Sequence, residues 1–200
     1  MSEQKVSSVG WGFWLQWVLA STVGAVMVDL VLHGSNFLFA DWHVAINVII
    51  VASWLVAAAL IGIMQWRVLR KQISIGTVWL WISSISWAIG ILVLFFMLLF
   101  GIGGPMVGGA TLTSGTFVGL VVGSIQYIVL RRQVSQAGWW VLASTAGWVI
   151  VGWSIAWHGW NLWKLFGWSS GGFVAFGIGH ALYGAITGFA LVWLLRRPRP

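Results

Sequence analysis

Six long apolar runs constrain this chain more than any other feature. Each run approaches the roughly 20 residues that a helix needs to cross about 30 Å of hydrocarbon, and only a helix satisfies its backbone polar groups within one such segment. Hydrophobic residues make up 60% of the chain and charged residues 6%, far from the averages of soluble domains. The sequence therefore predicts an all-α polytopic membrane protein with a single transmembrane domain, 1–200, whose six transmembrane helices cover about residues 11–32, 44–68, 77–100, 111–130, 139–157 and 172–195.

Basic residues gather at one set of helix ends. If the chain crosses six times, only Lys164 lies opposite the other nine, which are Lys5, Arg67, Arg70, Lys71, Arg131, Arg132, Arg196, Arg197 and Arg199. Such a bias marks the cytoplasmic side of a membrane protein. We expect both termini in the cytoplasm, in a bacterial inner membrane or a specialised internal membrane. Membrane lipids, rather than nucleic acid, are the expected partners of this charge.

The chain repeats itself about every 62 residues. A Trp-Val-Leu-Ala-Ser motif and a weaker variant begin the odd helices, at 17–21, 79–83 and 140–144. A Gln-x3-Leu-basic-basic motif ends the even helices at 65–71 and 126–132, and Leu195-Arg-Arg197 repeats its last three positions with Leu191 in place of the glutamine. We predict three tandem parallel two-helix repeats, at about 10–71, 72–132 and 133–197.

Small residues four apart recur on the even helices. The pairs are Ala58 and Gly62, Gly119 and Gly123, and Gly184 and Gly188. Such pairs let two backbones approach closely in a membrane. Our hypothesis is that the even helices pack together at the centre through these faces, with the Trp-rich odd helices outside. Gln65 and Gln126 are expected to form interhelical hydrogen bonds, with a transport-related role as the alternative.

The non-cytoplasmic half carries the few polar residues that could bind a ligand. His33-Gly-Ser-Asn36 and His158-Gly-Trp-Asn161 share a His-Gly-x-Asn pattern, and His180 and Asp29 belong to the same half. One interpretation is helix capping, with glycine in the left-handed position after the helix. The other is a ligand site near the outer leaflet formed by Asp29, His33, His158 and His180, whose cofactor the sequence does not identify; it indicates no metal site.

The predicted outer loop 157–170 has tryptophans at helical spacing, at Trp157, Trp160 and Trp163. We expect a short separate helix there, lying in the outer interface with Lys164 directed to water.

The motifs Gly-Trp-Trp-x-Leu-Ala-Ser, at 138–144, and Gln-x3-Leu-Arg-Arg, at 126–132, resemble repeats of uncharacterised bacterial multi-pass membrane proteins rich in Trp and Gly. The resemblance covers most of the chain. It implies the repeated hairpin fold and no particular activity.

Composition narrows the function classes. The chain has no cysteine and three acidic residues, and no serine, histidine and acid are expected to meet, so we predict that it is not an enzyme. We expect an accessory or assembly subunit, or a lipid-interacting scaffold, of a membrane complex, with other membrane subunits or pigments as further partners. The alternatives are a small transporter or channel, and a binder of an apolar pigment, haem or quinone near the outer leaflet.

Overall fold

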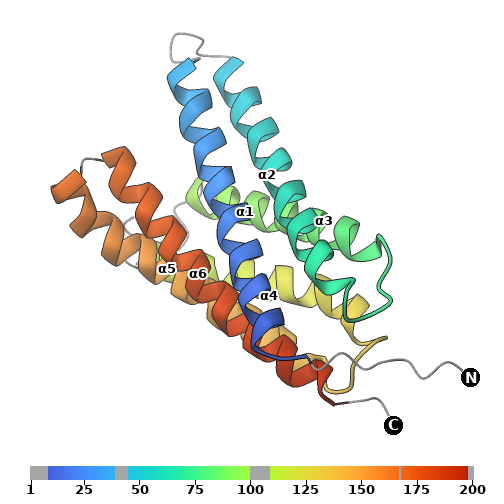
Figure 1. The fold of residues 1–200 in the computed structure, drawn as a ribbon. Coiled ribbons are helices and arrows are strands. Elements are labelled where there is room, and N and C mark those ends of the chain that lie inside the picture. The colour runs from blue at the N-terminus through green and yellow to red at the C-terminus, as the bar shows by residue number, and fades with distance from the viewer. Residues whose placement is uncertain (1–8, 39–44, 100–108, 167, 198–200) are drawn as a thin grey trace, which may run out of the picture.

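The described residues form six helices (Figure 1). The computed structural model describes residues 9–38, 45–99, 109–166 and 168–197, and for some helical residues it describes the backbone alone. The helices are α1 (Trp11–Leu38), α2 (Ala45–Leu69), α3 (Val78–Leu99), α4 (Gly109–Leu130), α5 (Gly138–Phe166) and α6 (Trp168–Leu195).

Three helices are longer than the sequence predicts, and one of them, α6, begins at Trp168 rather than near residue 172. α1 continues through Gly34 to Leu38, and α5 continues through Gly159 to Phe166. The capping interpretation of the two His-Gly pairs is therefore wrong, because both glycines lie inside helices. The prediction of a separate interfacial helix over 157–170 is also wrong, since α5 itself fills most of that segment and α6 begins at Trp168.

The helices form a closed ring in chain order. Each helix contacts the helix before it and the helix after it, and α6 contacts α1. Within the described residues the backbones of the even helices do not approach one another closely, so the hypothesis that α2, α4 and α6 pack together at the centre through their small-residue faces is wrong. The glycine-bearing faces meet odd helices instead, and bulky rings of the odd helices occupy the middle of the bundle.

The small residues mark close approach between neighbours in this ring. Gly62 lies against Leu80 and Ser84 of α3, while Gly119 and Gly123 lie against α5. Gly184 and Gly188 lie against α1, and Ala58 is buried. A Cβ atom added to Gly119 would stand 2.6 Å from the Cα atom of Thr145. The helix backbones are thus too close for a larger side chain at such a position.

The three hairpins α1–α2, α3–α4 and α5–α6 converge at one end and diverge at the other (Figure 1). The convergent end holds the start of α1, the end of α6 and the two turns 70–77 and 131–137. We call it the basic end, because its exposed residues include Arg67, Arg70, Lys71, Arg131, Arg132, Arg196 and Arg197.

Three described segments are long and apolar enough to cross a membrane, namely Leu112–Leu130, Gly138–Trp157 and Val174–Leu195. Ala58–Leu69 and Val78–Gly90 are shorter apolar helical segments.

Candidate functional site

Three tryptophans meet in the middle of the bundle near the basic end. Trp17, Trp79 and Trp140 come from α1, α3 and α5, and each is fully buried. Their ring centroids are 6.0 to 6.4 Å apart, and the rings meet edge to face, which is a favoured geometry for aromatic pairs. This tryptophan triad joins all three odd helices.

Hydrogen bonds tie the triad to the even helices. Trp140 Nε1 donates to Gln126 Oε1 at 3.0 Å, and Gln126 Nε2 donates to Ser83 Oγ at 3.1 Å. Gln126 of α4 therefore links α3 and α5. Trp17 Nε1 donates in the same way to Thr187 Oγ1 of α6, at 3.0 Å.

Thr187 of α6 thus accepts from the Trp17 indole as Gln126 of α4 accepts from the Trp140 indole. The sequence aligns Leu191, not Thr187, with Gln126. Leu191 is instead fully buried in the same apolar cluster as Leu69 and Leu130. Gln65, in contrast, has neither side-chain polar atom paired within the described structure, although it is fully buried.

A second aromatic layer surrounds His180. The ring centroid of His180 is 4.2 Å from that of Phe176, and those of Trp87, Trp148 and Tyr183 are 5.8 to 6.2 Å away. Its Nδ1 atom lies 3.0 Å from the carbonyl oxygen of Phe176. Since a carbonyl only accepts, Nδ1 carries the proton in the neutral ring, and Nε2 presents a lone pair.

This layer, which we call the His180 cluster, holds three buried ring nitrogens without a hydrogen-bond partner in the described structure: His180 Nε2, Trp87 Nε1 and Trp148 Nε1. The indole N–H groups can only donate and the imidazole Nε2 can only accept. The cluster therefore holds two unused donors and one unused acceptor inside an apolar bundle. Among the described residues no group of three His, Cys, Asp or Glu could hold a metal ion.

The other predicted ligand residues lie on helices whose side chains are described only in part. Asp29 and His33 belong to α1 and His158 belongs to α5, but the side chains of all three fall outside the described part. The partners that surround His180 were missed. Trp87 and Trp148 did carry a signal, since they are one repeat length apart, whereas nothing in the sequence distinguishes Tyr183.

At the basic end, arginine side chains contact aromatic rings. A guanidinium stands over an aromatic ring four residues earlier on each even helix: Arg70 over Trp66 at 4.5 Å, Arg131 over Tyr127 at 6.0 Å, and Arg197 over Trp193 at 3.9 Å. Such cation–π contacts fix the position of an arginine without neutralising its charge.

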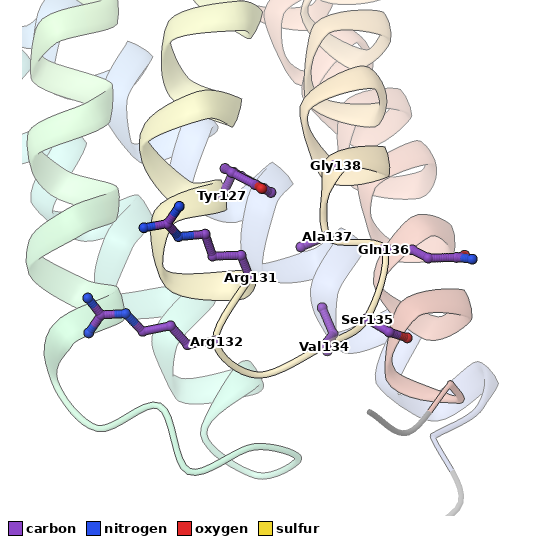
Figure 2. A pocket seen from close by; sticks show the side chains of 8 residues that line it. All are labelled: Tyr127, Arg131, Arg132, Val134, Ser135, Gln136, Ala137 and Gly138. Atoms are coloured by element: carbon purple, nitrogen blue, oxygen red, sulfur yellow. The ribbon is translucent and has the colours of Figure 1, made fainter. Parts of the chain in front are cut away.

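An open hollow of about 770 Å³ lies at the α4–α5 junction (Figure 2). Tyr127, Arg131 and Arg132 line it from α4, and Val134–Gly138 line it from the turn and the start of α5. Figure 2 shows both arginine side chains extending from the end of α4.

Comparisons of the chain with models of protein families, with curated proteins and with solved structures give no match.

Proposed function

We propose that the chain is a polytopic integral membrane protein that spans a bacterial inner membrane, or a specialised internal membrane, with all six helices. This proposal rests on rows of large apolar side chains that face outward from the helices. On α1 they are Leu15, Leu19, Val23, Met27 and Leu30, and on α3 they include Trp81, Ile85, Leu92 and Phe96, all exposed. Water would oppose such an exterior, whereas the hydrocarbon of a bilayer solvates it.

Three tandem parallel two-helix repeats are part of the same proposal, and corresponding contacts support it. Gly123 faces Val141 and Ser144 of α5 as Gly184 faces Val18 and Ser21 of α1. The third copy of the even helix then follows the second by 61 residues, the distance between Gly123 and Gly184.

This register also accounts for Thr187, which follows Gln126 by the same distance. It pairs Gly184 with Gly123 rather than with Gly119, and it leaves α6 about one turn longer at the basic end than α4.

For the role of the protein we propose a non-enzymatic scaffold, as an accessory or assembly subunit of a membrane complex. The tryptophan triad and the His180 cluster fill the middle of the bundle with rings, which favours a rigid body over a conduction path. The surfaces that remain for function are the apolar exterior, facing lipids or other subunits, and the basic end.

Two measurements test these proposals. Because the chain has no native cysteine, single substitutions report sidedness directly. Ser35→Cys should react with an impermeant maleimide in intact cells, and Ser74→Cys only after permeabilisation; the reverse pattern would overturn the orientation. Mild detergent extraction should then release a discrete complex heavier than the chain and its copies alone. A bare monomer would contradict the assembly role.

The His180 cluster favours a second candidate function, a binder of a small ligand such as a quinone, whose carbonyl oxygen could accept the indole N–H groups. Gently purified protein should then carry an absorbing compound, and His180→Phe should lose it. A protein that is colourless at every stage and shows only tryptophan absorption would contradict this second function.

A further inference from the structure

A groove runs between the start of α1 and the end of α6 at the basic end, where these two helices lie side by side (Figure 1). It consists of two hollows, of about 80 and 300 Å³, that share Phe189, Val192 and Arg196 as lining residues. We call it the α1–α6 groove. Its lining residues are Gly10, Trp11 and Trp14 on the α1 side, and Phe189, Val192, Trp193, Arg196 and Arg197 on the α6 side.

The walls of the groove are apolar and fixed in position. Trp14 is held against α6 because its Nε1 atom donates to the Ala185 carbonyl at 2.9 Å. Trp11 packs edge to face on Trp14, with ring centroids 5.6 Å apart. Phe189 and Trp11 nevertheless expose 63% and 76% of their surface. An apolar occupant of the groove would therefore cover aromatic surface that is already in place.

Two exposed arginines, Arg196 and Arg197, line the groove at its basic end. Every contact that the described structure gives their guanidinium groups is with a neutral partner. Arg196 Nε donates to the Val9 carbonyl at 2.8 Å. Arg197 donates through Nη1 to Gln136 Oε1 at 3.0 Å, and its guanidinium stacks on the Trp193 ring at 3.9 Å. These contacts position the two cations without neutralising them, and they leave further N–H groups that can donate to an anion.

The apolar and cationic parts of the groove follow one another along the axis of α6. Phe189 and Val192 precede Arg196 by 7 and 4 residues, or about 10 and 6 Å. Both lie within Val174–Leu195, a segment long and apolar enough to cross a membrane, and Arg196 comes directly after it. In a bilayer spanned by α6, the apolar floor lies at hydrocarbon depth and the arginines lie at headgroup depth. A phospholipid has its acyl chains and its phosphate in the same order.

We propose that the α1–α6 groove binds an anionic phospholipid of the cytoplasmic leaflet, with an acyl chain on Phe189 and Val192 and the headgroup phosphate at Arg196 and Arg197. This inference rests on the proposed function, since it places α6 in the bilayer with the basic end in the cytoplasm. A lipid is favoured over a soluble anion because the soluble anion would leave the apolar floor of the groove uncovered.

The test is a lipid titration of the full chain, delipidated in detergent and observed by native mass spectrometry. Phosphatidylglycerol and phosphatidylcholine with the same acyl chains are the probes, and wild-type protein should bind the first phosphatidylglycerol more tightly than the first phosphatidylcholine. Arg196→Gln/Arg197→Gln should weaken that first phosphatidylglycerol on the order of 25-fold, since each basic residue at an anionic surface changes affinity about fivefold. Arg196→Lys/Arg197→Lys, which keeps both charges, should weaken it less than about fivefold.

Arg67→Gln/Arg70→Gln is the matched control. It removes the same charge from the same end and also removes a cation–π contact, that of Arg70 with Trp66, but neither arginine lines the groove. It should weaken the first phosphatidylglycerol less than about twofold. An equal loss in the two Gln variants, or no preference for phosphatidylglycerol in the wild type, would overturn the site.

Two further outcomes concern the occupant. Displacement of phosphatidylglycerol by millimolar glycerol 3-phosphate would overturn the choice of a lipid over a soluble phosphate. A wild-type complex that excludes phosphatidylglycerol until a protein subunit is removed would make that subunit, and not the lipid, the occupant of the groove.

Stability and sidedness are measured separately from lipid binding. All three variants should keep the wild-type thermal midpoint, so that a lost lipid is not a lost fold, and the lipid preference of the wild type needs no variant at all. The maleimide labelling described above tests the proposed function independently. Wrong sidedness contradicts that function whatever the titration gives, whereas correct sidedness without a lipid preference contradicts this site alone.

Discussion

At the scale of single residues, two positions hold a left-handed backbone just before a helix. Gly76 has φ of 55° and Gln136 has φ of 58°, two residues before α3 and α5 begin. An L side chain in this region is strained by roughly 1–2 kcal/mol, and glycine is not. Gln136 tolerates the strain while its side chain accepts a hydrogen bond from Arg197 at 3.0 Å.

Gly76→Ala tests the backbone requirement in isolation. A Cβ atom at Gly76 would meet nothing within 4 Å, so any loss comes from φ and not from crowding. We expect the free energy of unfolding to fall by about 1 kcal/mol, measured by SDS titration in mixed micelles. Gly138→Ala is the control, since a Cβ there also meets nothing and its φ is not positive. A larger loss at Gly138 than at Gly76 would contradict this explanation.

At the scale of the helices, the α4–α5 contact depends on glycine. A Cβ atom on Gly119 would stand 2.6 Å from the Cα of Thr145 and 3.0 Å from the Ser144 carbonyl oxygen. Both neighbours are backbone atoms, so neither can move without separating the helices. We expect Gly119→Ala to cost about 1–3 kcal/mol of stability, as overpacking typically does.

The check is the same SDS titration, with Gly12→Ala as control, because a Cβ at Gly12 of α1 meets nothing within 4 Å. If Gly119→Ala unfolded at the wild-type SDS fraction, α4 and α5 would not approach as closely as described.

The helices could be predicted from the sequence, but their partners could not. The length of the apolar runs alone locates α2, α3 and α4 to within a few residues, because each run is bounded by polar or glycine-rich segments. A small-xxx-small pair such as Gly119 and Gly123 marks close approach without saying which helix approaches. In the closed ring, the small-residue faces of the even helices pack against odd helices. This arrangement depends on contacts between segments that are far apart in the sequence.

In the candidate site, likewise, one residue could be predicted from the sequence but its neighbours could not. His180 could be recognised because a histidine is rare in an apolar helix. Its surroundings come from α3, α5 and α6, and only the folded chain brings Trp87, Trp148 and Tyr183 together.

At the scale of the whole molecule, the bundle is tied together around its middle by indole hydrogen bonds. Trp140 to Gln126 and Trp17 to Thr187 each join an odd helix to the even helix before it in the ring. Trp79 and Gln65 stand at the third such position, and they are as far apart in the sequence as Trp140 and Gln126 are. There the Trp79 Nε1 atom and both Gln65 polar atoms have no partner within the described structure. The energetic contribution of the three positions should therefore differ.

Gln126→Leu and Gln65→Leu measure that difference. Gln126→Leu leaves Trp140 Nε1 and Ser83 Oγ without their buried partner, so we expect it to lower the free energy of unfolding by about 1 kcal/mol, given roughly 0.6 kcal/mol per interhelical bond in a membrane protein. Gln65→Leu removes polar atoms that make no bond and should leave stability unchanged or slightly raised. SDS titration of the two variants in the same micelles gives the comparison. Equal losses would mean that Gln65 makes the same bonds as Gln126, and that the hydrogen-bonded ring closes at all three positions.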